Sequence, residues 1–172
     1  MGSKENFGTG SHSVVRSFAP IISGVFSVTN PTGDEEIKAE LVPPAWPVTT
    51  TTTTSTSTLS EGNVKTAHLD VRCRAETDTK EHVYIRYSGI LTVDGTVAKA
   101  IRRESDSKST RFENHSNWFT KVMIETSDQR LKWLETLFLV GQGRIQVDDD
   151  NDDNDAGGGS RTGAEYAIYK LC

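Results

Sequence analysis

Residues 68–89 constrain the fold most, because charged and apolar side chains alternate along the first half of this stretch. The charged or polar positions are His68, Asp70, Arg72, Arg74 and Glu76, and the positions between and before them are Ala67, Leu69, Val71, Cys73 and Ala75. Successive side chains of a β-strand point to opposite faces of a sheet, so one face of this strand is ionic and the other is apolar. The ionic face is either a solvated surface or the polar wall of a binding cavity, and the alternation alone leaves both interpretations open.

Short β-like runs separated by turn residues fill most of the remaining chain. Besides 66–76 and 83–93, the predicted strands are 21–28, 37–42, 96–103, 118–126, 134–140, 144–147 and 165–171. Turns are predicted at the NPTGD cluster 30–34, at Asp94-Gly95 as a two-residue hairpin, and at Gly141-Gln142-Gly143. Residues 128–135 also fit helical spacing and are alternatively a short helical turn. With no long amphipathic helix, the pattern predicts an all-β antiparallel sandwich or closed barrel.

The length of 172 residues predicts one domain with a single core. We expect residues 1–15 to be a disordered leader, because this segment is rich in Gly and Ser without periodicity, and the domain to span 16–172. Two tracts predict mobile loops: the Thr and Ser run at 49–60, and the acidic, then Gly-rich run at 148–160.

Composition and charge limit the kinds of partner molecule that we expect. The net charge is −5, and Lys and Arg do not cluster with aromatic residues, so we expect no nucleic-acid partner. No apolar run is long enough to cross a bilayer and the first fifteen residues lack a signal-peptide block, so we expect no membrane partner and a cytoplasmic location. The two cysteines, Cys73 and Cys172, do not form a disulfide framework.

The sequence also argues against several kinds of site. The histidines at 12, 68, 82 and 115 lie in separate segments without ligand spacing, so no metal site is expected. The acidic tract fails as a calcium loop, because Asp153 and Gly159 stand where such a loop needs Gly and Glu. There is no Gly-rich phosphate loop before a helix and no Gly-x-Ser-x-Gly elbow. We therefore expect no cofactor and no covalent nucleophile.

Four segments follow the order of a known family. They are LDVRCRAETDTKEHVYIRYSG at 69–89, residues 119–125, LKWLETLFLVGQGR at 131–144 and AEYAIYKL at 164–171. In these segments the chain resembles the family catalogued as domain of unknown function 3237, or uncharacterised protein family 0311. The most specific pieces are Asp70-Val71-Arg72, Tyr84-Ile85-Arg86 and Trp133-Leu134, and Glu135 departs from the Asn usual after Trp-Leu. The resemblance implies a closed antiparallel β-barrel of about eight strands with a central ligand cavity, and it implies no reaction.

Fungal members of the family are similar to accessory proteins of natural-product pathways, where cofactor-free barrels guide cyclisations or isomerisations. By this analogy we expect a small-molecule substrate, with catalytic groups at Asp70, Arg72, Tyr84 and Arg86. An adjacent Arg keeps an Asp ionised as a base or acceptor, and Arg and Tyr donors polarise a carbonyl. The expected substrate-binding residues are Trp46, His68, Trp118, Met123 and Trp133.

The leading functional hypothesis is a cofactor-independent enzyme. It binds an apolar, oxygenated intermediate and directs its cyclisation or isomerisation, including a pericyclic step of the hetero-Diels–Alder type, by holding a reactive conformer. The alternatives are a non-catalytic carrier of a hydrophobic ligand and an interaction module that uses the Thr-rich and acidic loops. On a further alternative, Asp70, Arg72 and Arg86 are silent cross-strand ion pairs on the surface, and Trp118 and Trp133 are core residues. The oligomeric state is left open by the sequence.

Overall fold

In a computed structural model of the chain, residues 5–9, 15–18, 21, 23–29, 32–33, 35–42, 51–55, 65–114, 118–148 and 161–171 are described. The strands are β1 (Glu5–Thr9), β2 (Val15–Phe18), β3 (Val25–Thr29), β4 (Glu36–Leu41), β5 (Thr51–Ser55), β6 (Lys65–Thr77), β7 (His82–Val93), β8 (Trp118–Thr126), β9 (Leu139–Asp148) and β10 (Arg161–Lys170). The helical elements are α1 (Gly95–Arg102) and the 3-10 segments η1 (Phe112–Asn114) and η2 (Gln129–Thr136).

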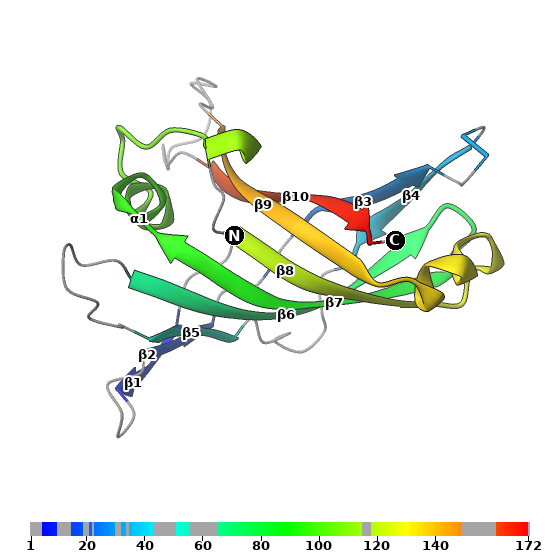
Figure 1. Cartoon of the computed structure of the whole chain (residues 1–172), viewed down its shortest axis with the longest axis horizontal. Helices are drawn as coiled ribbons and strands as arrows, with labels where there is room; N and C mark the ends of the chain where they lie inside the picture. The colour runs from blue at the N-terminus through cyan, green and yellow to red at the C-terminus, as the bar shows by residue number, and fades with distance from the viewer. Residues whose placement is uncertain are drawn as a thin grey trace.

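The strands form one antiparallel sheet in the order β1-β2-β5-β6-β7-β8-β9-β10 (Figure 1). Strand β6 has two neighbours on its far side, because its first half pairs with β5 and its last residues pair with β4. Strand β4 also pairs with β3, which confirms the hairpin predicted around the turn cluster at 30–34. The sheet therefore forks at β6.

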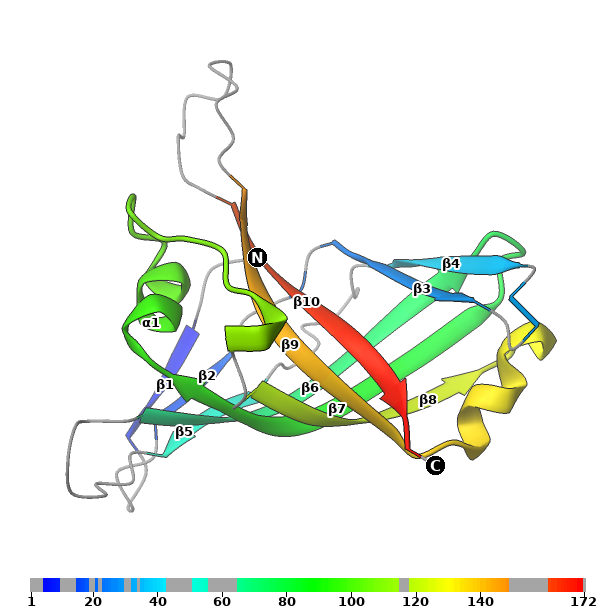
Figure 2. The ribbon, with the colours of Figure 1, turned by 45° about the horizontal axis from the view of Figure 1, so that its top comes forward.

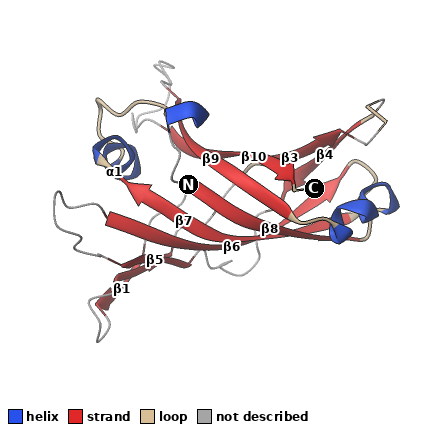
Figure 3. Ribbon diagram, in the orientation of Figure 1, coloured by secondary structure: helices blue, strands red, loops and turns tan. Residues whose placement is uncertain are grey.

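The sheet curves into a half-barrel. Figure 2 shows β3 and β4 lying over one end of the concave face of β6–β8, while α1 lies at the opposite end. Figure 3 shows that helical elements occur only at the ends of this curved sheet within the described part of the chain (Figure 3). The all-β antiparallel architecture is confirmed; a closed barrel of about eight strands with a central cavity stays a prediction, because β10 pairs only with β9 among the described strands.

Two hydrophobic clusters fill the concave side. The first joins β4, the end of β6, the start of β7, β8 and η2, through Ile37, Ala75, Val83, Ile124 and Leu131 among others. The second lies at the α1 end and contains Ala67, Leu69, Leu91, Val97, Ala100, Trp118 and Ile145. The apolar positions of β6 to β9 thus face the core, and burying them stabilises the curved sheet by about 25 cal/mol per Å² of apolar surface.

Residues 95–102 form a helix, so the prediction of a strand at 96–103 after a hairpin turn is wrong. The Asp94 carboxylate accepts a hydrogen bond from the Val97 N–H at 2.8 Å and caps the helix N-terminus. Val97 and Ala100, three positions apart, are both buried against the second cluster. No helix among the described residues is long and apolar enough to cross a membrane.

The predicted turn at Gly141-Gln142-Gly143 is also wrong, because these residues lie inside the continuous strand β9. A Cβ atom at Gly143 would lie 2.5 Å from ring carbons of Trp118. Glycine here lets the indole of Trp118 lie directly on the backbone of β9. The alternative of a short helical turn near 128–135 is confirmed by η2, and residues 134–136 of the predicted strand 134–140 belong to it.

Two segments predicted to lack regular structure contain strands. Residues 51–55 of the predicted mobile loop form β5, which pairs with β2 and β6, since Thr is well suited to β geometry. Residues 5–9 of the predicted leader form β1, which pairs with β2. The rest of the loop at 49–60 and residues 149–160 of the other predicted loop lie outside the described residues.

A buried carboxylate and its arginine partner connect three segments of the chain near the first cluster. The Asp128 side chain is only 4% exposed, and its oxygens accept hydrogen bonds from Arg130 Nε and Nη2, the latter at 2.7 Å. The same guanidinium contacts Asp78 in the β6–β7 turn at 2.7 Å and Glu35 before β4 at 3.2 Å. These contacts hold the turn, η2 and the β4 segment in one arrangement.

The ion pair predicts how stability depends on acid. The Arg130 hydrogen bonds lower the pKa of Asp128 from 3.8 to about 2. A carboxyl whose pKa is depressed by folding stabilises the protein above its unfolded pKa, and this contribution is lost as pH falls from about 4 toward 2. In urea unfolding at several pH values over this range, Asp128→Asn should show a shallower decline than wild type. Equal slopes for the two proteins would contradict this role of Asp128.

The contact between Trp118 and Gly143 predicts a second stability effect. Gly143→Ala should lower the free energy of unfolding by about 1–3 kcal/mol, because the methyl group must displace a buried indole. Gly163→Ala is the matched control on the paired strand, since its Cβ would have its nearest neighbour at 4.0 Å. Urea denaturation measures both. A loss no larger in Gly143→Ala than in Gly163→Ala would show that the contact is not tight.

Candidate functional site

The four predicted catalytic residues lie on the convex face of the sheet. Asp70 makes two ion pairs, with Arg72 Nη2 and Arg86 Nε, both at 3.4 Å. Their side chains are between 36% and 50% exposed, and Tyr84 occupies the same face of β7 as Arg86. The catalytic hypothesis needs these residues inside a cavity, whereas the alternation of β6 and β7 turns them away from the core. Their role in catalysis stays a prediction.

The predicted substrate-binding residues are scattered. His68 and Met123 lie on the convex face, where Met123 is 42% exposed, and Trp46 lies outside the described residues. Trp133 is in η2, packs against the first cluster and donates its Nε1–H to the Arg130 carbonyl at 3.0 Å. Trp118, the first residue of β8, is 4% exposed and points into the concave side, where it belongs to the second cluster.

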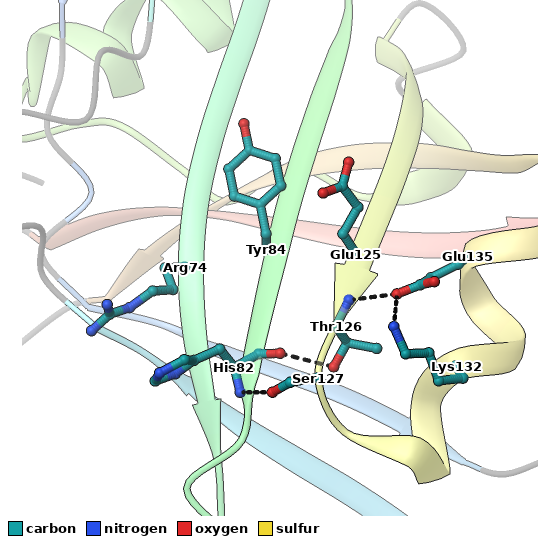
Figure 4. A pocket seen from close by; sticks show the side chains of 8 residues that line it. All are labelled: Arg74, His82, Tyr84, Glu125, Thr126, Ser127, Lys132 and Glu135. Atoms are coloured by element: carbon teal, nitrogen blue, oxygen red, sulfur yellow. Dashed lines mark hydrogen bonds and ion pairs between the residues drawn. The ribbon is translucent and has the colours of Figure 1, made fainter.

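An open groove of about 620 Å³ crosses the convex face at the η2 end (Figure 4). A cross-strand row of Arg74, Tyr84 and Glu125 forms part of it, and its other lining residues are His82, Thr126, Ser127, Lys132 and Glu135. Figure 4 shows Glu135 between the backbone N–H of Thr126 and the Lys132 ammonium, both at 2.8 Å. These two contacts, with Lys132 the stronger, lower the pKa of the Glu135 carboxyl. Charges on so open a surface are screened by water and salt, which weakens any catalytic field.

The concave face carries a different group of residues, which we call the aromatic centre: Tyr87, Trp118 and Tyr166. The rings of Tyr87 on β7 and Tyr166 on β10 have centroids 4.7 Å apart. The indole of Trp118 on β8 meets Tyr166 edge-on, with centroids 5.4 Å apart and an interplanar angle of 83°. Strands β8 and β9 separate Tyr87 from Tyr166 in the sheet, and the glycines of β9 leave the space in which the rings meet.

The two tyrosines of the aromatic centre are less completely buried than the innermost residues of the clusters. Residues of the flanking clusters, such as Val83, Leu131 and Val97, are fully buried. Tyr87 and Tyr166, by contrast, remain partly exposed, and so does Cys73 on β6. The described inward positions of β6 to β9 carry no charged side chain. This part of the concave face is therefore apolar and aromatic.

Burial raises the pKa of the two tyrosines and of Cys73. It raises the pKa of both Tyr87 and Tyr166 well above the usual value of a tyrosine, so both hydroxyls keep their protons at neutral pH. Burial also raises the pKa of the Cys73 thiol to about 11, and its Sγ contacts the Ile85 carbonyl at 3.7 Å. The thiol is therefore a poor nucleophile. The Trp118 indole N–H is buried without a hydrogen-bond partner within the described structure.

Tyr87 and Tyr166 were not among the site residues predicted from the sequence. Tyr87 lies two and four positions after Ile85 and Val83, so its parity already placed it on the apolar face of β7. The predicted catalytic residues lie instead on the charged face of the same strands. Tyr166 carried no comparable signal, because the short segment at 164–171 does not show which of its faces is covered.

Within the described ranges, no three or more His, Cys, Asp or Glu side chains come together in a way that could hold a metal ion. The aromatic centre itself contains hydrogen-bond donors, two phenols and an indole, in an apolar setting. Donors of this kind orient a ligand and stabilise negative charge that develops on its oxygen atoms.

Comparisons with known proteins agree on the fold. A family model described as "Protein of unknown function (DUF3237)" matches residues 2–171. A β-barrel-like protein from Acinetobacter baumannii AYE is 18% identical over 98% of this chain and 87% of that one, with a TM-score of 0.54. A protein with unknown function from Clostridium acetobutylicum ATCC 824 is 18% identical over 98% of this chain and 89% of that one, with a TM-score of 0.59.

A conserved protein of unknown function from Rhodopseudomonas palustris gives a similar result. It is 19% identical over 83% of this chain and 80% of that one, with a TM-score of 0.57. No curated protein matches the chain. At these identities the structural similarity supports the fold alone.

The exposure of the convex ion pairs predicts a small energetic role. Asp70→Asn should change the free energy of unfolding by less than about 1 kcal/mol, because exposed pairs gain little over hydrated charges. Urea denaturation at low and high salt measures this change. A loss of several kcal/mol that disappears at high salt would instead make Asp70 a structural charge centre.

Proposed function

The chain belongs to the DUF3237 family of proteins of unknown function, and we propose that it binds a neutral, largely apolar, oxygen-bearing small molecule at the aromatic centre and directs its cyclisation or isomerisation without a cofactor. One observation carries this proposal. On the concave face, two partly exposed tyrosines and a buried tryptophan make ring contacts with one another; Tyr87 packs against the first hydrophobic cluster, while Tyr166 packs against the second, to which Trp118 belongs. Such a group of aromatic rings suits contact with an aromatic ligand.

The charge distribution favours a neutral ligand. The charged residues of β6 from Asp70 to Glu76 and Arg86 of β7 point to the convex face, and the inward positions whose burial is described for β6 to β9 are uncharged. Burying an ion without a partner there costs several kcal/mol, whereas a planar apolar molecule gains from each Å² it covers. A carboxylate or an amine would therefore bind poorly.

The proposed reaction follows from the groups available. Cyclisation, isomerisation or a hetero-Diels–Alder addition within one molecule rearranges bonds and needs no oxidant, reductant or leaving group. The protein then has two tasks: to hold the reactive conformer and to hydrogen-bond an oxygen that gains negative charge. Aromatic walls suit the first task, and the Tyr87, Tyr166 and Trp118 donors suit the second.

The wider context belongs to the same proposal. We propose that the half-barrel closes into a barrel around the ligand, that the protein acts in a fungal natural-product pathway, and that it does so in the cytoplasm. The resemblance in residues 69–89 and 131–144 supports the barrel, and the Thr-rich tract at 49–60 suits a eukaryotic source. None of these points is needed for binding at the aromatic centre.

Binding of a neutral fluorescent probe tests the proposed site. N-phenyl-1-naphthylamine should bind the wild-type protein with one-to-one stoichiometry, and Tyr166→Ala should weaken binding by at least about tenfold, because it removes a wall of the site. Tyr169→Ala is the matched control, since this tyrosine is on the same strand but 52% exposed. A triple variant of the convex face, Arg72→Ala with Tyr84→Phe and Arg86→Ala, should bind like wild type.

The opposite pattern of probe binding would contradict a site at the aromatic centre. If the triple variant loses the probe and Tyr166→Ala keeps it, the ligand binds on the convex face.

A second experiment distinguishes an enzyme from a carrier. It identifies the compound that copurifies with the protein from its own source. A precursor converted on addition of fresh protein supports the enzyme, whereas a compound released unchanged under every condition supports the carrier.

A further inference from the structure

Large apolar side chains lie exposed on the convex face of β7 to β10. We call this group the apolar patch, and each member is between 42% and 56% exposed: Ile90, Phe119, Met123, Phe138, Tyr169 and Leu171. The solvent-facing side of an antiparallel sheet is normally polar. An exposed patch of large apolar residues marks a surface that another molecule covers.

The apolar patch is continuous across neighbouring strands. Ile90 of β7 is the pairing partner of Phe119 on β8. The Leu171 N–H, just after β10, donates to the carbonyl of Phe138, just before β9, at 3.0 Å. The members therefore lie side by side on one face instead of being scattered over the surface.

The outward side chains of β8 carry a specific charge pattern at the patch. Lys121, Met123 and Glu125 are successive outward positions of this strand, and all three are exposed. The Lys121 Nζ lies over the ring of Phe138, 5.3 Å from its centroid. Neither Lys121 nor Glu125 makes an ion pair within the described part of the chain. One positive and one negative charge thus lie at equal distances on either side of Met123.

We propose that a second copy of this chain docks on the apolar patch to form a two-fold symmetric dimer. Its axis lies in the plane of the convex face, crosses β8 at Met123 and runs perpendicular to the strand. In such an interface residue i contacts residue j of the partner, and j contacts i. Lys121 of each copy therefore faces Glu125 of the other, and the two Met123 side chains meet on the axis.

The charge pattern selects this arrangement over the obvious alternative. An axis parallel to β8 would set Lys121 against its own copy and Glu125 against its own copy, and like charges in an interface are unfavourable. The pattern also continues across the sheet. The row that contains Lys121 reaches Asp70 on β6, and the row that contains Glu125 reaches Arg74. The perpendicular axis therefore sets opposite charges against each other in both strands.

Two arginines lie on the proposed axis. Arg72 and Arg86 belong to the same cross-strand row as Met123 and would face their own copies. Both contact the Asp70 carboxylate at 3.4 Å, which offsets their charge. The sheet also curves, so that β6 lies further from a partner that touches the convex face at β8 to β10. The dimer leaves the concave face uncovered, and it does not rest on the function proposed for that face.

Sedimentation velocity of the full chain over a series of concentrations tests the dimer. Wild type should sediment as a dimer of the 18.9 kDa chain, and Met123→Asp should sediment as a monomer, because it sets two carboxylates against each other on the axis. Val25→Asp is the matched control, since Val25 is 66% exposed but lies on β3, outside the patch. This variant should remain a dimer.

Charge reversal tests which residues face each other. Lys121→Glu and Glu125→Lys should each weaken dimerisation by about a hundredfold or more, because each sets like charges against each other twice. The double variant should dimerise again. A mixture of the two single variants should form a heterodimer, in which every pair at these positions is attractive. Circular dichroism checks that each variant is folded.

Three results would overturn the proposal. The first is a wild-type protein that stays monomeric at every concentration. The second is a dimer that survives both single charge reversals, because its interface would then lie elsewhere, for example at the edge of β10. The third is a failure of both the double variant and the mixture to restore the dimer, which would show that Lys121 and Glu125 do not face each other.

Discussion

The pairing of β6 with β7 is the constraint on which the rest of the structure depends. It runs without interruption from Lys65 opposite Val93 to Glu76 opposite His82, and it fixes which side chains of both strands face the core. Strands β8 and β9 continue the same register outward. A slip of β6 by one residue against β7 would bury Arg72 and Arg74 and expose Val71 and Ala75. The cost of burying those charges keeps the register unique.

This register separates two kinds of chemistry. The convex face holds ion pairs in water, where they contribute little energy and form a weak field. The concave face holds uncharged groups at low exposure, where a single hydrogen bond to a ligand counts for more because water does not compete. The glycines of β9 belong to the second face, since they let Trp118 and Tyr166 meet over the strand backbone. The site we propose therefore depends on the absence of side chains at Gly141 and Gly143 as well as on the aromatic rings.

The fold was more predictable from the sequence than the site. Strict alternation in β6, β7 and β8 predicted these strands closely. Asp94-Gly95, in contrast, suits a hairpin turn and a helix cap equally well. Only the burial of Val97 and Ala100 decides for the helix. Glycines at 141 and 143 suggested a turn because their packing partner, Trp118, lies on another strand. The sequence predicted catalytic residues on the charged face, but the alternation shows only that these residues share a face, and whether they act in catalysis stays a prediction. Tyr166 could not be predicted, because only the pairing of β10 with β9 places it opposite Gly143.

The most direct test of a ligand site at the aromatic centre is the proton–nitrogen NMR spectrum of the indole groups during titration with 2-acetylnaphthalene. The chain has three tryptophans, so the indole signals are few and assignable by substitution. We expect the Trp118 signal to shift, while that of Trp133, already bonded to the Arg130 carbonyl, stays in place. An unmoved Trp118 signal together with a shift of the Thr126 amide, which bonds Glu135 in the convex groove, would contradict the account.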